Sequence, residues 1–152
     1  MSKIKIIYLL IFLLVVSCGY EPLYLDKTKN DFNLKIIKTE GDNEINQIIF
    51  QKLNLKNKNS NKNYLIEINS NYEKKTLGKN LKGNTSNYEI EINVFFKIIL
   101  NNQEKKVSFK EKMEMQKIEN SFDELKYEKT IKKNLVENIE KKLIMYITTN
   151  FK

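Results

Sequence analysis

A strictly alternating segment between Tyr88 and Leu100 constrains the fold more than any other feature of the sequence. Its apolar row has a member at every second position: Tyr88, Ile90, Ile92, Val94, Phe96, Ile98 and Leu100. Because successive side chains of a strand point to opposite faces, this pattern predicts a long strand with one face buried. A lone strand or hairpin is not stable in water, so the rest of the chain must supply sheet neighbours and a covering layer.

Three further segments have the properties of such neighbours. Residues 64–72 alternate in the same way, after a solvated loop at 56–63, and they are separated from the long strand by a glycine-punctuated loop at 77–84. An Asn-rich turn then leads to a strand predicted over 107–115. Glu111 interrupts the apolar row of this strand, which an edge strand can tolerate. A shorter strand is predicted over 32–38.

Two segments have helical spacing instead. Asp42 is a good N-cap residue, and Ile45, Ile48, Ile49 and Leu53 follow it at helical intervals. Ser121 to Glu124 match the capping-box pattern S-x-x-E and open a long amphipathic helix. Its apolar stripe is Ile131, Leu135, Ile139, Leu143 and Ile147, and its other side is Lys and Glu.

The predicted order is therefore strand, helix, three strands, helix. This order favours an α+β fold, a two-layer sandwich in which two helices pack on one face of a four-stranded, mostly antiparallel sheet. We expect this domain to span residues 31–152.

The N-terminus has the organisation of a targeting signal. Lys3 and Lys5 precede an unbroken apolar run of 11 residues, 6–16. A membrane-spanning helix needs about 20 apolar residues, so this run fits the core of a signal peptide. It leads into Ser17-Cys18, which resembles the lipobox of bacterial lipoproteins. We expect a cleaved lipoprotein signal peptide at 1–17 and a lipidated tether at 18–30.

Cys18 is the only cysteine of the chain and occupies the position that lipoprotein maturation requires. By that resemblance its thiol carries diacylglycerol and its new N-terminus is acylated; several acyl chains anchor a protein stably, whereas one does not. Gly19 after the cysteine favours sorting to the outer membrane. The alternatives are an ordinary secretory signal with an incidental cysteine, or a buried hydrophobic cysteine.

The composition excludes most catalytic chemistry. All 27 basic residues are Lys, and the absence of His and Arg excludes imidazole-based triads, imidazole metal ligands and guanidinium forks. One cysteine excludes a cysteine-rich metal site, so we expect no metal and no cofactor beyond the covalent lipid. Glu89 and Glu91 lie on one strand face as paired carboxylates can, but a solvated strand face explains them. We therefore expect no enzyme.

The chain resembles the lipopolysaccharide-assembly lipoprotein family LptE in its alphaproteobacterial form. The resemblance is carried by the lipobox with the segment Cys-Gly-Tyr-Glu-Pro-Leu-Tyr at 18–24, by Leu77-Gly78 and the loop 83–88, and by the amphipathic helix between Tyr127 and Tyr146. Members of this family plug the lumen of the outer-membrane β-barrel LptD, assist its assembly and take part in lipopolysaccharide transport. The resemblance thus implies LptD, lipopolysaccharide and the outer membrane as partners, with no nucleic acid.

The resemblance also implies site residues. Family members bind lipopolysaccharide through basic residues near the ends of the middle strands, where this chain has Lys79, Lys82 and Lys117. Each of them has the alternative of an ordinary solvated charge, because Lys binds phosphate as a point charge and not as a fork. Two groups are expected to face the barrel or else to pack within their own domain: Tyr20, Leu23 and Tyr24 in the tether, and Phe95 and Ile99 opposite the core row.

A function of a different binding class stays open at this stage. An accessory lipoprotein of another envelope machine, such as a barrel-assembly subunit or a secretin pilot, would share Cys18 and the positive net charge of +8. It would not need a plug-shaped domain.

Overall fold

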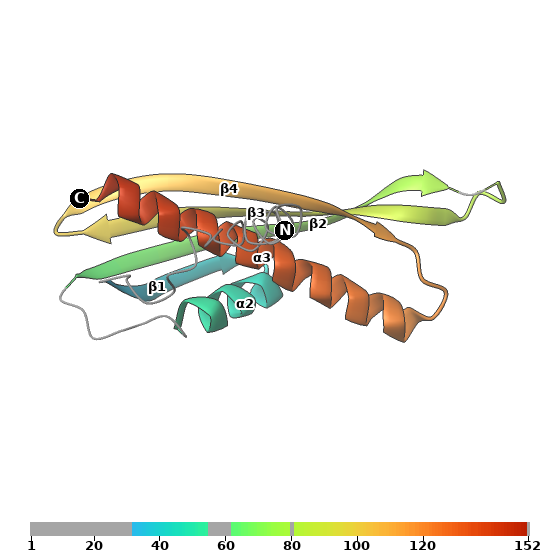
Figure 1. Ribbon diagram of the computed structural model, residues 1–152, viewed down its shortest axis with the longest axis horizontal. Coiled ribbons are helices and arrows are strands. Elements are labelled where there is room, and N and C mark those ends of the chain that lie inside the picture. The colour runs from blue at the N-terminus through green and yellow to red at the C-terminus, as the bar shows by residue number, and fades with distance from the viewer. Residues whose placement is uncertain (1–31, 55–61, 80, 152) are drawn as a thin grey trace, which may run out of the picture. The chain divides into compact units, whose positions relative to one another are not determined.

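The computed structural model describes residues 32–54, 62–79 and 81–151 (Figure 1). The predicted signal peptide, the lipidation site and the whole of the tether lie outside these residues, as does most of the loop predicted at 56–63. The elements are, in order, β1 (Asn33–Gly41), α2 (Asn43–Asn54), β2 (Asn63–Lys79), β3 (Thr85–Leu100), β4 (Gln103–Gln116) and α3 (Ser121–Asn150).

The four strands form one mixed sheet in the order β1-β2-β3-β4. The strand β1 is parallel to β2, whereas β2–β3 and β3–β4 are antiparallel hairpin pairs. Both helices lie on the same face of this sheet (Figure 1). The predicted α+β sandwich with the order β-α-β-β-β-α is therefore confirmed.

The alternating row of β3 forms the floor of the core. Ile90, Ile92, Val94, Phe96 and Ile98 are all fully buried beneath the helices. The stripe of α3 covers them with Ile131, Leu135, Ile139, Leu143 and Ile147, which are equally buried. Glu111 of β4 faces the same side opposite Ile92, and it pairs there with Lys142 of α3 at the open edge of the sheet. The interruption of the apolar row is thus an ion pair between layers.

Gly41 decides where β1 leaves the sheet. Its φ is +88°, and a Cβ at this position would lie 1.8 Å from the carbonyl oxygen of Ser70 on β2. The chain turns here so that Asp42 donates its N–H to that same carbonyl, and the Asp42 carboxylate then accepts the N–H of Ile45 at 2.9 Å as the cap of α2. Pairing between β1 and β2 ends at Ser70, and β2 continues for nine residues, 71–79, without β1 beside it.

Several predicted boundaries were wrong: β1 continues to Gly41 instead of ending at 38, and β4 begins at Gln103 instead of 107. Two further differences affect the site. The loop predicted from Leu77 begins later, because β2 runs to Lys79 and stays paired with β3 through register shifts at Thr76–Gly78–Lys79. The cap of α3 is Asn120 and not Ser121: the Asn120 side chain accepts the N–H groups of Phe122 and Asp123. In a capping box the Glu124 side chain would accept the backbone N–H of the cap residue, but here it binds other partners.

Gly41 gives the first testable prediction. Gly41→Ala forces a Cβ into the backbone of β2 and should lower the free energy of unfolding by about 3 kcal/mol or more. Gly83→Ala is the matched control, since Gly83 also has a positive φ, of +81°, but no atom lies within 4 Å of the added Cβ. That variant should lose only about 1 kcal/mol. Urea denaturation measures both, and equal losses would contradict the role given to the close approach of Gly41 to Ser70.

Candidate functional site

The helix-facing side of the sheet changes from apolar to polar along β2. Tyr64, Ile66 and Ile68 belong to the apolar core, and the next residues on the same face are Ser70, Tyr72 and Lys74. Above them, one row of α3 steps by four residues through Glu124, Glu128 and Lys132, each only 8% exposed. Along β2, a polar cluster therefore follows the apolar residues where β1 no longer flanks the strand, whereas Ile90, Ile92 and Met115 of β3 and β4 stay fully buried at this level.

Glu128 is the centre of this cluster. One carboxylate oxygen accepts the hydroxyl of Tyr72 at 2.7 Å and the ammonium of Lys132 at 3.2 Å. The other oxygen accepts the ammonium of Lys74 at 2.8 Å. A buried carboxylate is costly unless its lone pairs are satisfied, and here three donors from β2 and α3 satisfy them.

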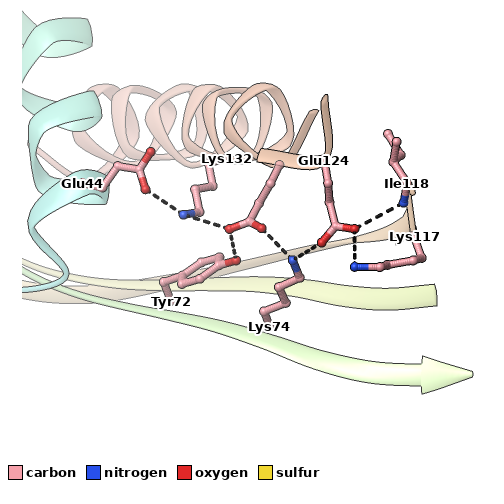
Figure 2. Close-up of polar contacts among 8 residues, drawn as sticks. Glu44, Tyr72, Lys74, Lys117, Ile118, Glu124 and Lys132 are labelled. Carbon is pink, nitrogen blue, oxygen red and sulfur yellow. Dashed lines mark hydrogen bonds and ion pairs between the residues drawn. The ribbon is translucent and has the colours of Figure 1, made fainter. Parts of the chain in front are cut away.

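Glu124 lies one helical turn earlier and binds three groups. Its carboxylate accepts Lys74 at 3.1 Å, Lys117 at 2.9 Å and the backbone N–H of Ile118 at 3.3 Å (Figure 2). The carboxylate thus ties α3 both to β2 and to the turn that follows β4. This engagement explains why Glu124 does not complete the predicted capping box.

Lys132 extends the cluster to the second helix. Its ammonium lies 2.7 Å from a carboxylate oxygen of Glu44 in α2 and 4.0 Å from the centre of the Tyr72 ring. Figure 2 shows the resulting chain of polar contacts, which runs from α2 through α3 and β2 to the end of β4.

The pKa values of these groups reflect both burial and their partners. Burial opposes ionisation of Glu128, but bonds from Lys74, Tyr72 and Lys132 outweigh it and lower the pKa of Glu128 to about 2. Burial likewise opposes the charged form of Lys132, yet Glu44 and Glu128 raise its pKa above the usual value. Burial and the neighbouring Glu128 together raise the pKa of Tyr72, which keeps its hydroxyl a donor.

The cluster is electrically balanced. Three ammonium groups, of Lys74, Lys117 and Lys132, lie among three carboxylates, of Glu44, Glu124 and Glu128. The bond to Glu124 and the neighbouring Tyr88 raise the pKa of Lys117, whereas the bond from Lys117 lowers the pKa of Glu124. The formal charges of the three ammonium groups and the three carboxylates cancel.

A hollow of about 590 Å³ opens beside the cluster. It is lined by Asn84, Thr85, Ser86, Tyr88, Lys117 and Glu119. The ring of Tyr88 lies below two cations, with Lys74 at 4.2 Å and Lys117 at 5.8 Å from its centre. Lys117 is thus shared between the buried cluster and an open hollow.

The three predicted lipopolysaccharide-binding lysines lie at this same end of the sheet. Lys79 pairs with Thr85 across the β2–β3 hairpin, and Lys117 donates its backbone N–H to Ser86 at 2.8 Å. Lys82 lies in the turn between these strands. All three side chains are exposed, and that of Lys117 is also ion-paired with Glu124. The structure brings the three lysines together at one end; their role as ligands for lipopolysaccharide stays a prediction.

Exposed apolar side chains occur at the same end. Leu77 and Leu81 are exposed on the β2–β3 hairpin, Leu81 completely. Phe122 and Leu125, in the first turns of α3, are 72% and 65% exposed. Lysines and uncovered apolar groups together suit a ligand that is both anionic and fatty.

The residues predicted to face a partner are placed only in part. Phe95 and Ile99 lie on the sheet face opposite the helices, as expected, with Phe95 exposed and Ile99 half-buried. Phe95 borders a small hollow of about 130 Å³ that Glu67, Asn69 and Lys97 also line. Cys18, Tyr20, Leu23 and Tyr24 lie outside the described residues.

Within the part of the chain that the structure describes, no group of His, Cys, Asp or Glu side chains could hold a metal ion. Over the same residues, no helix combines the length and the apolar character that crossing a membrane requires.

The buried cluster was missed by the sequence analysis. The sequence pattern predicts a solvated face for Lys and Glu on α3 and an apolar strand face for Tyr72. Two signals could have found it: Lys74 continues the buried row of β2 at period two, and Glu128 and Lys132 form an i,i+4 pair beside the apolar stripe.

Comparisons with known proteins identify the fold. No protein-family model matches the chain, and no curated protein matches it. Among solved structures, the chain is similar to rare lipoprotein B from Shewanella oneidensis, with a TM-score of 0.55 and 14% identity over 77% of this chain and 97% of that one. It is also similar to a candidate lipoprotein from Caulobacter crescentus, with a TM-score of 0.56 and 12% identity over 76% and 88%. Lipoprotein B from Nitrosomonas europaea gives a TM-score of 0.52 and 13% identity over 79% and 88%. The chain therefore has the fold that these lipoproteins share.

Glu128 gives the prediction for this site. Because its pKa is depressed in the folded chain, its stabilisation is complete above the unfolded pKa and is lost as the pH falls from about 5 towards 2. Glu128→Gln should lower the free energy of unfolding by about 3 kcal/mol at pH 7, and the difference from wild type should shrink on acidification. Urea denaturation at a series of pH values measures this.

Glu114→Gln is the control for that experiment, since Glu114 is exposed on the outer face of β4. It should change stability by less than about 0.5 kcal/mol at each pH. A Glu128 variant with the same pH profile as wild type would refute the assignment of a strongly depressed pKa to this carboxyl group.

Proposed function

We propose that the chain is an outer-membrane lipoprotein of the LptE type, which plugs the β-barrel LptD, assists its assembly and takes part in passing lipopolysaccharide to the outer leaflet. The observation that carries this proposal is the combination of a lipobox at Cys18 with a fold that covers 97% of a rare lipoprotein B. A fold alone does not define a function, but this one follows directly on a lipoprotein signal.

The end of the domain that carries the ion cluster has surface groups that suit lipopolysaccharide as a ligand. Lipopolysaccharide carries phosphate groups and acyl chains, and this end offers lysines at 79, 82 and 117 beside the exposed Leu81 and Phe122. Under the proposal the lysines meet the phosphates as point charges, and the apolar side chains meet the acyl region.

The anchor and the barrel contacts complete the proposal. S-diacylglycerol and N-acyl groups on Cys18 hold the chain to the outer membrane from its periplasmic side. Phe95 and Ile99 on the outer sheet face, with Tyr20, Leu23 and Tyr24 near the anchor, face the wall of the barrel lumen. The proposed role is binding and assembly, with no catalytic residue and no cofactor.

Affinity purification from detergent-solubilised outer membranes tests this proposal. The tagged wild-type lipoprotein should bring down a large β-barrel protein in stoichiometric amount, identified by its mass. Cys18→Ala is the control, because it should leave the domain folded but reduce its recovery in the outer membrane.

Acylated protein without a barrel partner would refute the LptD assignment. That result would favour an accessory lipoprotein of another envelope machine, and the co-purifying proteins would identify the machine.

A further inference from the structure

The strongest observation that the proposed function leaves unexplained is the position of Glu124. Its carboxylate lies between Lys74 and Lys117, 3.1 Å from one ammonium and 2.9 Å from the other. Lys117 is the cation that also borders the open hollow beside Tyr88. An anionic ligand that enters this hollow therefore meets a lysine whose charge is already compensated.

We propose that Glu124 is an internal competitor for the anion site, and that a phosphate monoester binds there by displacing the Glu124 carboxylate from Lys117. The inference rests on the proposed function for the source of the phosphate, but the exchange itself is a property of these residues. Glu124 thereby sets which anions the site accepts.

The charge balance explains why a monoester is favoured. The charges of three cations and three carboxylates cancel in the cluster. A monoanion that replaces the Glu124 carboxylate at Lys117 brings the same single negative charge, so the exchange gives it no electrostatic advantage. A phosphate monoester carries close to two negative charges at neutral pH and three acceptor oxygens, whereas a diester carries one charge. Only the monoester offers Lys117 more charge than Glu124 does.

The neighbouring contacts make the exchange feasible. Lys74 keeps its bond to Glu128 at 2.8 Å when Glu124 moves, so Lys74 is not left without a carboxylate partner. Lys117 is 43% exposed in its side chain and can reorient over the Tyr88 ring. Asn120, and not Glu124, caps α3, so the helix start does not depend on the displaced carboxylate.

The distinctive expectation is that removing the Glu124 carboxylate increases the affinity for a phosphate monoester. Glu124→Gln keeps the shape of the side chain and an acceptor for Ile118 but removes its charge. In the full-length lipoprotein in detergent, this variant should bind short-chain phosphatidic acid roughly fivefold more tightly than wild type. Wild type should bind phosphatidic acid more tightly than the methyl phosphodiester of the same lipid. In Glu124→Gln this ratio of affinities should be smaller, because no carboxylate competes with the singly charged diester for Lys117. Calorimetry measures the affinities.

Controls separate this exchange from general electrostatics. Glu119→Gln removes a charge from the rim of the same hollow, and Glu137→Gln removes one from a distant ion pair with Lys52 and Lys141. Both should give a smaller gain than Glu124→Gln. Adding Lys117→Gln to Glu124→Gln should abolish the gain. If the site recognises the phosphate alone, the affinities for the soluble probe glycerol phosphate should follow the same order among the variants. If only the affinity for the lipid changes, the site recognises phosphate and acyl chains together.

Unchanged or weaker binding by Glu124→Gln would overturn the inference and leave Glu124 as an anchor of the turn after β4. An equal gain from Glu119→Gln would also overturn it, since the effect would then be unspecific. These outcomes are independent of barrel co-purification: a tighter Glu124 variant without any barrel partner would support the exchange and refute the proposed function.

Discussion

The carboxylates of Glu124 and Glu128 hold the N-terminal half of α3 on the part of β2 that β1 does not flank. Gly41 removes β1 from the sheet at Ser70, and the helix-facing row of β2 changes from apolar to polar at the same level, while Ile92 and Ile90 continue the apolar row of β3. Beyond that point the two layers are joined through Tyr72, Lys74 and Lys132. The β4–α3 turn is held to α3 by the Glu124 carboxylate, which binds Lys117 and the backbone of Ile118, and to β3 by the backbone N–H of Lys117, which donates to Ser86.

This arrangement gives the two ends of the domain different properties. At one end, aromatic rings of Phe32, Tyr64 and Phe151 pack edge to face and close an apolar core. At the other end an ion cluster lies in the interior beside Ile90 and Met115, and an open hollow is lined by Tyr88, Lys117 and Glu119 among others. A buried ion cluster fixes geometry more than it adds stability. Under the exchange proposed for Glu124, the cluster holds Lys117 beside an open hollow while Glu124 compensates its charge.

Much of the fold could be predicted from the sequence, because period-two and helical patterns report burial directly. The row of β3 and the stripe of α3 were found in this way, as was the order of elements. Two things could not be found locally. Asn120 and Ser121 are adjacent residues of equal capping ability, so the local pattern does not decide between them, and the Glu124 expected in the capping box instead binds Lys74, 50 residues away in the sequence. The buried cluster was likewise invisible, because Lys and Glu beside an apolar stripe have the same pattern whether they face water or each other. The lysines at 79, 82 and 117 were placed near strand ends by resemblance, and the sheet register then explains why they share one end.

The central claim is that this ionic end of the domain is the one that meets lipopolysaccharide. The most direct measurement is photo-crosslinking in cells, with a photoreactive residue in place of Leu81 at the hairpin or of Met145 near the C-terminal end of α3, both exposed positions. The account predicts lipopolysaccharide adducts from position 81 and few or none from position 145. Equal adducts from both positions, or adducts from position 145 alone, would contradict it.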